Sequence, residues 1–98
     1  MILTTTNNIE GFRISEYKGI VSGTSSELKT KFSFKTDKNM QMIEDLMNEA
    51  KEQAFQKMQE NARKLNANAI VGISVDIETA SGSYFFVSVV GTAVSVIE

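Results

Sequence analysis

The last predicted strand, YFFVSVVGTAVSV at 84–96, constrains the fold most, because it is apolar on both of its faces. Alternation puts Phe85, Val87 and Val89 on one face, and Phe86, Val90, Val94 and Val96 on the other. An antiparallel sheet usually buries one face and leaves the other to water. A strand that is apolar on both faces therefore needs a cover on each side.

The chain offers one helix for this purpose, in residues 40–65. Glu, Gln, Lys and Asn surround a single apolar stripe with steps of three and four, formed by Ile43, Leu46, Met47, Ala50, Ala54, Met58, Ala62 and Leu65. Arg63 and Lys64 suit the negative end of the helix dipole, and Asn66 is a plausible left-handed terminator. Such a helix is about 39 Å long, whereas typical strands span ~17–20 Å. One helix cannot cover both faces of a sheet, so the second face and the overhanging helix predict a partner subunit.

The remaining segments alternate as strands do. Residues 2–6 predict a short strand and residues 12–23 a longer one, in which a bulge near Lys18 and Gly19 would explain a change of apolar parity. Residues 28–35 predict a third strand, and 69–79 forms a hairpin with the last strand through the turn ASGS. In 69–79, Val71, Ile73, Val75 and Ile77 point one way. We therefore expect one α+β domain over 1–98, an antiparallel sheet of about five strands packed by one long helix.

Composition excludes several classes of protein. The chain has no cysteine and no histidine, which removes disulfides and the commonest general base. A net charge of −2 argues against nucleic-acid binding, and no apolar run reaches the ~20 residues of a membrane span. No nucleophile elbow or phosphate loop occurs. We expect a cytoplasmic protein that is not an enzyme, with neither nucleic acid nor membrane as a partner.

Asp76 and Glu78 form the first candidate site, a metal site. They lie two apart on the polar face of 69–79, roughly 6.5 Å apart along the strand. Paired carboxylates can bind a hard divalent cation, the one cofactor that the sequence suggests. An exposed strand face is also where carboxylates normally lie, and two ligands fall well short of a calcium shell.

A lysine-faced segment, 27–36 or ELKTKFSFKT, forms the second candidate site. Leu28, Phe32 and Phe34 alternate there with Lys29, Lys31 and Lys35. The lysine side could bind an anion, yet lysines on an edge strand also guard against edge-to-edge aggregation. The pattern leaves both interpretations open.

Three stretches resemble the YbjQ-like family, labelled "putative heavy-metal-binding". They are TTTNNIEGFRISEYKGIVSG, ANAIVGISVDIETASG and VSVVGTAVSVI, with ARKLNANA between the first two, and they cover about two thirds of the chain. The resemblance implies a small α+β domain that assembles into a closed ring, with a homopentamer as the expected form.

Two departures from the family pattern bear on function. The family's interval rich in Arg-Asp pairs is here only residues 24–39, which contain the lysine-faced segment instead. Ser74 stands where the first of three acids often lies, leaving Asp76 and Glu78. The sequence thus predicts a non-catalytic homo-oligomeric ring with Phe86, Val90, Val94 and Val96 at the subunit interface. A cation module at Asp76 and Glu78, and an anion module at Lys29, Lys31 and Lys35, are the alternatives.

Overall fold

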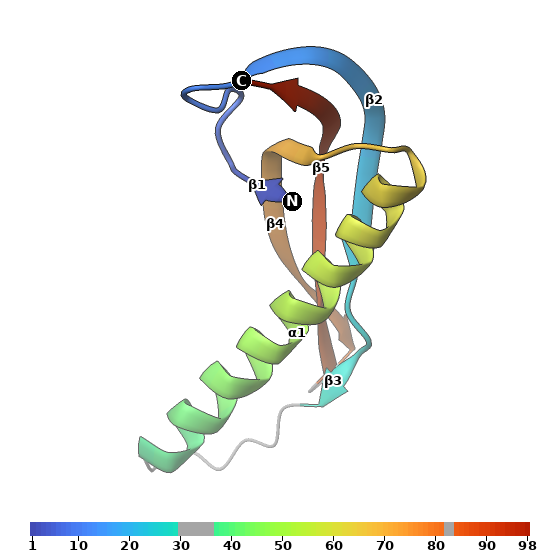
Figure 1. Cartoon of the computed structure of the whole chain (residues 1–98). Helices are drawn as coiled ribbons and strands as arrows, with labels where there is room; N and C mark the ends of the chain where they lie inside the picture. Colours follow the sequence, from blue (N-terminus) through green and yellow to red (C-terminus); the bar gives the residue numbers. More distant parts are fainter. Residues whose placement is uncertain (30–36, 82–83) are drawn as a thin grey trace.

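The computed structural model describes residues 1–29, 37–81 and 84–98. Six elements follow one another along the chain (Figure 1). They are β1 (Ile2–Leu3), β2 (Arg13–Thr24), β3 (Leu28–Lys29), α1 (Asp37–Lys64), β4 (Ala69–Ser81) and β5 (Tyr84–Ile97). The α+β class and the single long helix are confirmed. The predicted strand at 28–35 falls mostly on residues 30–36, which lie outside the described residues.

The strands form one sheet in the order β1-β4-β5-β2, and β3 pairs with β5 beyond the end of β2. β5 is central and runs antiparallel to both β4 and β2. β1 departs from the antiparallel prediction, because it pairs with β4 in parallel. β2 and α1 separate these two strands along the chain, so no tight turn forces them to run in opposite directions.

The helix lies diagonally across one face of the sheet, chiefly over β2 and β5 (Figure 1). The predicted stripe is confirmed at its centre, where Ala50, Ala54, Met58 and Ala62 are fully buried. Asn66 has a φ of 62°, the left-handed conformation expected after the last turn. Leu65 lies beyond the helix and is 40 % exposed, so it does not belong to the stripe.

Gly23 explains how closely the helix approaches the sheet. A Cβ atom at this position would lie 2.1 Å from the backbone oxygen of Ala54 and 2.7 Å from the backbone nitrogen of Met58. Only glycine lets the two backbones approach this closely. The first core fills the remaining space between α1 and the sheet, with Val21, Ile70, Ile73, Phe85, Val87, Val89 and Ala93 from the strands.

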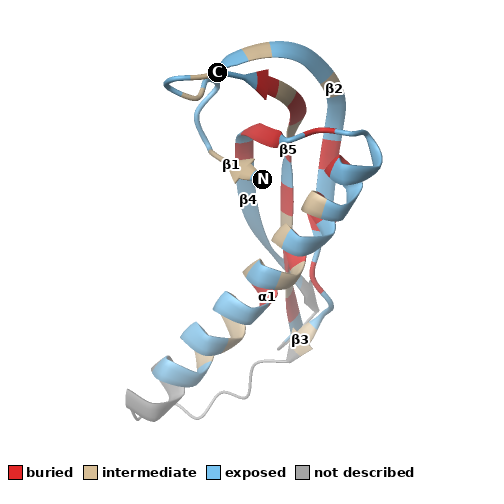
Figure 2. Ribbon diagram, viewed as in Figure 1, coloured by how far each residue is buried: buried red, intermediate tan, exposed pale blue. Residues whose placement is uncertain are grey.

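A second core lies on the opposite face of the sheet, at one end only. Ala69, Val71, Val94 and Val96 are buried there, and the partly buried Ile2, Ile9, Phe12 and Ile14 pack against them. The N-terminal segment and the curl of β2 thus cover this end of the second face, a cover that the sequence pattern does not predict. Figure 2 shows buried residues at this end of β5 and exposed residues along much of β4.

Bulges decide which residues face α1. The predicted bulge in β2 is confirmed by a register shift between Tyr17 and Gly19, and a second shift lies between Ile14 and Glu16. The prediction that Val71 shares a face with Ile73 is wrong. A register shift lies between Val71 and Ser74 around Gly72, whose φ is 62°. The extra residue leaves Val71 in the second core and Ile73 in the first.

The molecule is elongated, with extents of 51 × 23 × 16 Å. Its radius of gyration is 16.0 Å, against about 13 Å for a compact domain of this length. The helix contributes to this shape, because its N-terminal part extends beyond the sheet (Figure 1). The overhang of α1 therefore accounts for part of the elongated shape.

Candidate functional site

On the face of the sheet that points away from α1, no other described element covers the part of β2, β4 and β5 that lies beyond the second core. Residues that lie directly opposite across strands share a face, and the register places Ser22, Val90 and Ser74 in one row and Thr24, Ser88 and Asp76 in the next. Ile20, opposite Thr92, lies next to the first of these rows, on the side of the second core. We call this surface the open face; its members are Ile20, Ser22, Thr24, Ser74, Asp76, Glu78, Phe86, Ser88 and Val90.

Apolar side chains are unusually accessible on the open face. Ile20 is 80 % exposed and Val90, on the central strand, is 38 % exposed. Phe86 is half-buried. Isolated exposed apolar residues are common, but apolar residues grouped on one surface mark contact sites. The open face is therefore a candidate interaction surface.

Two of the four predicted interface residues lie on this surface, namely Phe86 and Val90. Val94 and Val96 are instead buried in the second core, where Phe12 and Ile14 pack against them. Their side chains have no area left for a partner to cover. Of the four predicted interface residues, only Phe86 and Val90 therefore have side-chain area that a partner could cover.

Asp76 and Glu78, the predicted metal pair, are exposed on the open face, opposite Ser88 and Phe86 of β5. In residues 1–29, 37–81 and 84–98, no group of three or more His, Cys, Asp or Glu side chains is placed to hold a metal ion. The structure thus brings the two predicted ligands together on one surface without adding a third. Two carboxylates fall short of the six to eight oxygen ligands of calcium.

The lysine-faced segment can be located only in part. Lys29 ends β3 and pairs with Tyr84 of β5; its side chain, Lys31 and Lys35 lie outside the described residues. The ammonium group of Lys18 on β2 donates to the carboxylate of Glu16 at 3.0 Å, so it is paired within its own strand.

The outer edge of β4 was not predicted as a site. The N-terminal segment bonds to this edge through Thr4, whose amide donates to Ile70 at 3.0 Å and whose carbonyl accepts from Ile73 at 3.1 Å. From Ser74 onward, no strand in the described part of the chain pairs with this edge. Val75 and Ile77 lie beside it on the α1 side of the sheet, 40 % and 50 % exposed. They are uncovered because α1 lies over β2 and β5.

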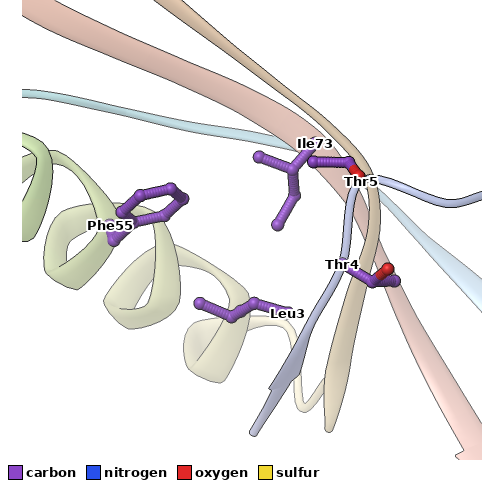
Figure 3. Close-up of a pocket in the computed structure, with 5 residues that line it drawn as sticks. All are labelled: Leu3, Thr4, Thr5, Phe55 and Ile73. Atoms are coloured by element: carbon purple, nitrogen blue, oxygen red, sulfur yellow. The ribbon is translucent and has the colours of Figure 1, made fainter.

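A pocket of about 190 Å³ lies between α1 and this edge, lined by Leu3, Thr4, Thr5, Phe55 and Ile73. Figure 3 shows the side chains of Leu3, Phe55 and Ile73 pointing into the same space from β1, α1 and β4. Alternation indicates that Ile73, Val75 and Ile77 share a face. The alternation does not show that α1 lies over β2 and β5 and leaves these side chains of β4 uncovered. Sequence reasoning therefore could not find the pocket.

Within the described ranges, α1 lacks the apolar length needed to cross a bilayer. A crystal structure of a protein with unknown function from Pediococcus pentosaceus ATCC 25745, assigned to the DUF74 family, has a similar fold. The TM-score is 0.66 at 24 % sequence identity, over 99 % of this chain and 98 % of that chain. The sequence profile of the YbjQ family, described as "Putative heavy-metal-binding", matches residues 1–97. DUF74 is the same family, and the chain belongs to it.

Proposed function

We propose that this protein is a non-catalytic cytoplasmic subunit of a homo-oligomeric ring, with the pentamer suggested by the sequence resemblance as its form. The observation that carries the proposal is the open face. Ile20 of β2 is exposed there, and so is Val90, although it lies on the central strand β5. The exposed side chains of Val75 and Ile77 support it, since a neighbouring copy could cover them as well.

Native mass spectrometry of the purified protein, without added metal or chelator, tests the proposal. We expect a clean multiple of the 10.8 kDa chain. Ile20→Asp should reduce the mass to that of one chain, because a buried carboxylate without a partner is costly at an interface. Ile20 is 80 % exposed in the single chain, so the substitution leaves the monomer fold intact.

Ile20→Thr is the matched control, because it keeps the β-branched shape without a charge and should preserve the assembly. Circular dichroism then separates loss of assembly from loss of folding. A wild-type protein that is monomeric at all concentrations would overturn the proposal. An Ile20→Asp variant that keeps its oligomeric mass would place the interface away from the open face.

A second candidate function is cation binding by Asp76 and Glu78. The family description supports it, and both carboxylates lie exposed on the open face, where several copies could bring their pairs together in a ring. A cation bound by the native state raises the melting temperature. We expect an increase with a divalent ion that Asp76→Asn and Glu78→Gln together abolish; an unchanged melting temperature across a panel of divalent ions would exclude the candidate.

A further inference from the structure

The two outer edges of the sheet differ in how they are protected. The edge of β2 has two register shifts, and its Ser22 carbonyl accepts from the side chain of Asn61 on α1 at 2.9 Å. Such bulges and covering groups guard an edge against further strands. On β4 the N-terminal segment pairs only as far as Ile73, and from Ser74 to Thr79 the described residues supply neither a neighbouring strand nor a register shift. This part of β4 is therefore open to strand addition.

The backbone groups that an added strand would bond belong to Val75 and Ile77. Ile77 lies opposite Val87 of β5, whose amide and carbonyl both bond to Ser25 on the other side of β5. Opposite residues of an antiparallel pair exchange either both hydrogen bonds or none. Ile77 therefore directs its own amide and carbonyl away from β5, to the outer edge, and Val75 does the same two residues earlier.

The side chains beside this edge differ between the two faces of the sheet. On the α1 side, Val75 and Ile77 are 40 % and 50 % exposed and follow Ile73, which lines the apolar pocket (Figure 3). On the open face, Asp76 and Glu78 are exposed, and neither forms an ion pair or hydrogen bond within the described ranges. Opposite charges across a strand pair stabilise it and like charges destabilise it. The edge therefore fits a strand that is apolar toward α1 and cationic on the other face.

The acidic pair also disfavours a second copy as the added strand. Residues that lie opposite each other across two strands share a face. If the β4 edges of two copies paired, the carboxylates of Asp76 and Glu78 would meet those of the other copy. The β2 edge of a second copy carries the guards described above. Neither of these two edges complements the edge of β4, so its charge points to another protein.

We propose that the edge of β4 from Ser74 to Thr79 binds an extended segment of another protein, in which apolar side chains alternate with Lys or Arg. Val75 and Ile77 hold the segment through their backbone groups, and its cationic side chains face Asp76 and Glu78. The pocket of about 190 Å³ receives its apolar side chain nearest to Ile73, since a cavity of about 150 Å³ is enough for benzene. The inference goes beyond the proposed ring, because it uses an edge of the sheet and no contact between copies.

Fluorescence anisotropy with a synthetic peptide, KVKVKVK labelled with fluorescein, tests the inference. We expect saturable binding that weakens at least about tenfold between about 50 and 500 mM salt, because salt screens exposed charges. EVEVEVE reverses the charge, and KKKKVVV keeps the composition without the alternation. Both should bind at least about tenfold more weakly. Equal binding of the three peptides, or no binding of KVKVKVK, would overturn the inference.

N-methylation of the peptide tests main-chain pairing without a change in the protein. Methyl groups on alternate amides remove the donors from one edge of the peptide only. We expect one methylated series to bind at least about tenfold more weakly and the other to bind normally. Loss in the valine series indicates antiparallel addition, and loss in the lysine series indicates parallel addition. Equal binding of the two series would overturn the inference.

Charge reversal in the protein tests the orientation of the bound segment. Asp76→Lys with Glu78→Lys should weaken KVKVKVK and strengthen EVEVEVE, each at least about tenfold. Both carboxylates are exposed, so the exchange leaves the fold intact, which circular dichroism checks. Glu49→Lys with Glu60→Lys is the matched control, because it changes the net charge equally at exposed positions of α1 and should leave binding unchanged. Equal effects of the two double variants would overturn the inference.

The Ile20→Asp chain separates this inference from the proposed function. We expect the wild type and Ile20→Asp to bind KVKVKVK with the same affinity. Binding by Ile20→Asp alone would mean that a neighbouring copy covers the edge of β4, and would overturn the inference. A monomeric wild type that binds the peptide would overturn the proposed function and support the inference.

Discussion

The two ends of β5 are alike in sequence and differ in their surroundings. Both ends alternate between apolar side chains on two faces, yet Val94 is fully buried whereas Val90 is 38 % exposed on the same face. The difference comes from residues 2–14, which fold over the end that holds Val94 and do not reach Val90. An apolar face is thus covered by the path of the rest of the chain, and beyond the reach of that path the face stays exposed.

Substitution of Gly23 should have the largest effect on stability. The contact at this residue holds α1 close to the sheet, and α1 covers one face of β5 along both of its ends. In Gly23→Ala, the new methyl group would lie 2.1 Å from the oxygen of Ala54, so α1 must move away from β2. We expect a loss of about 3 kcal/mol in the free energy of unfolding, at the upper end for overpacking, measured by urea denaturation. Ser22→Ala, at the neighbouring exposed position, should change it by less than about 0.5 kcal/mol. Equal stability of the two variants would mean that α1 does not lie this close to β2.

Truncation at the two ends of β5 measures the difference between them directly. Val94→Ala leaves a cavity in the second core and should cost about 2 kcal/mol. Val90→Ala should cost less than about 0.5 kcal/mol in a monomer, as at other exposed positions. The same denaturation, repeated at increasing protein concentration, sharpens the comparison. A cost at Val90 that grows with concentration indicates that a neighbouring copy covers this residue, whereas equal costs at low concentration would contradict the structural difference.

Substitution of Asn68 should have a smaller effect on stability, because its side chain contributes only hydrogen bonds to the covered end of β5. Its Oδ1 accepts from the amide of Val96 at 2.7 Å, and its Nδ2 donates to the carbonyl of Val96 at 3.0 Å. Asn68→Ala should cost about 1.5 kcal/mol, as expected for the loss of partly buried hydrogen bonds, and should speed hydrogen exchange at the Val96 amide. Asn61→Ala removes one exposed bond to Ser22 and should cost less. Unchanged exchange at Val96 would show that this pair does not hold the strand.

Much of the fold follows from the sequence where a local pattern meets no exception. The three-and-four spacing of Ala50, Ala54, Met58 and Ala62 predicts their burial, because a helix repeats its geometry at every turn. The alternation in β5 likewise predicts its two faces. The face of Val71 was predicted wrongly, because the glycine that allows the bulge is compatible with a regular strand as well.

The site could be predicted only in part, because coverage depends on contacts that are distant in sequence. Asp76 and Glu78 share a face, as their spacing requires. The burial of Val94 and Val96 depends on Phe12 and Ile14, about eighty residues earlier, and no local pattern reports that contact. The exposure of Val75 and Ile77 on β4 depends in the same way on the diagonal course of α1.

The bulge at Gly72 has a consequence for how this chain can change in evolution. A one-residue insertion in a strand normally moves every following side chain to the opposite face. Here the extra residue is absorbed at Gly72, so Ile70 and Ile73 both face α1 although they are three positions apart. Loss of one residue at this point would therefore leave a regular strand in which the same side chains still face α1.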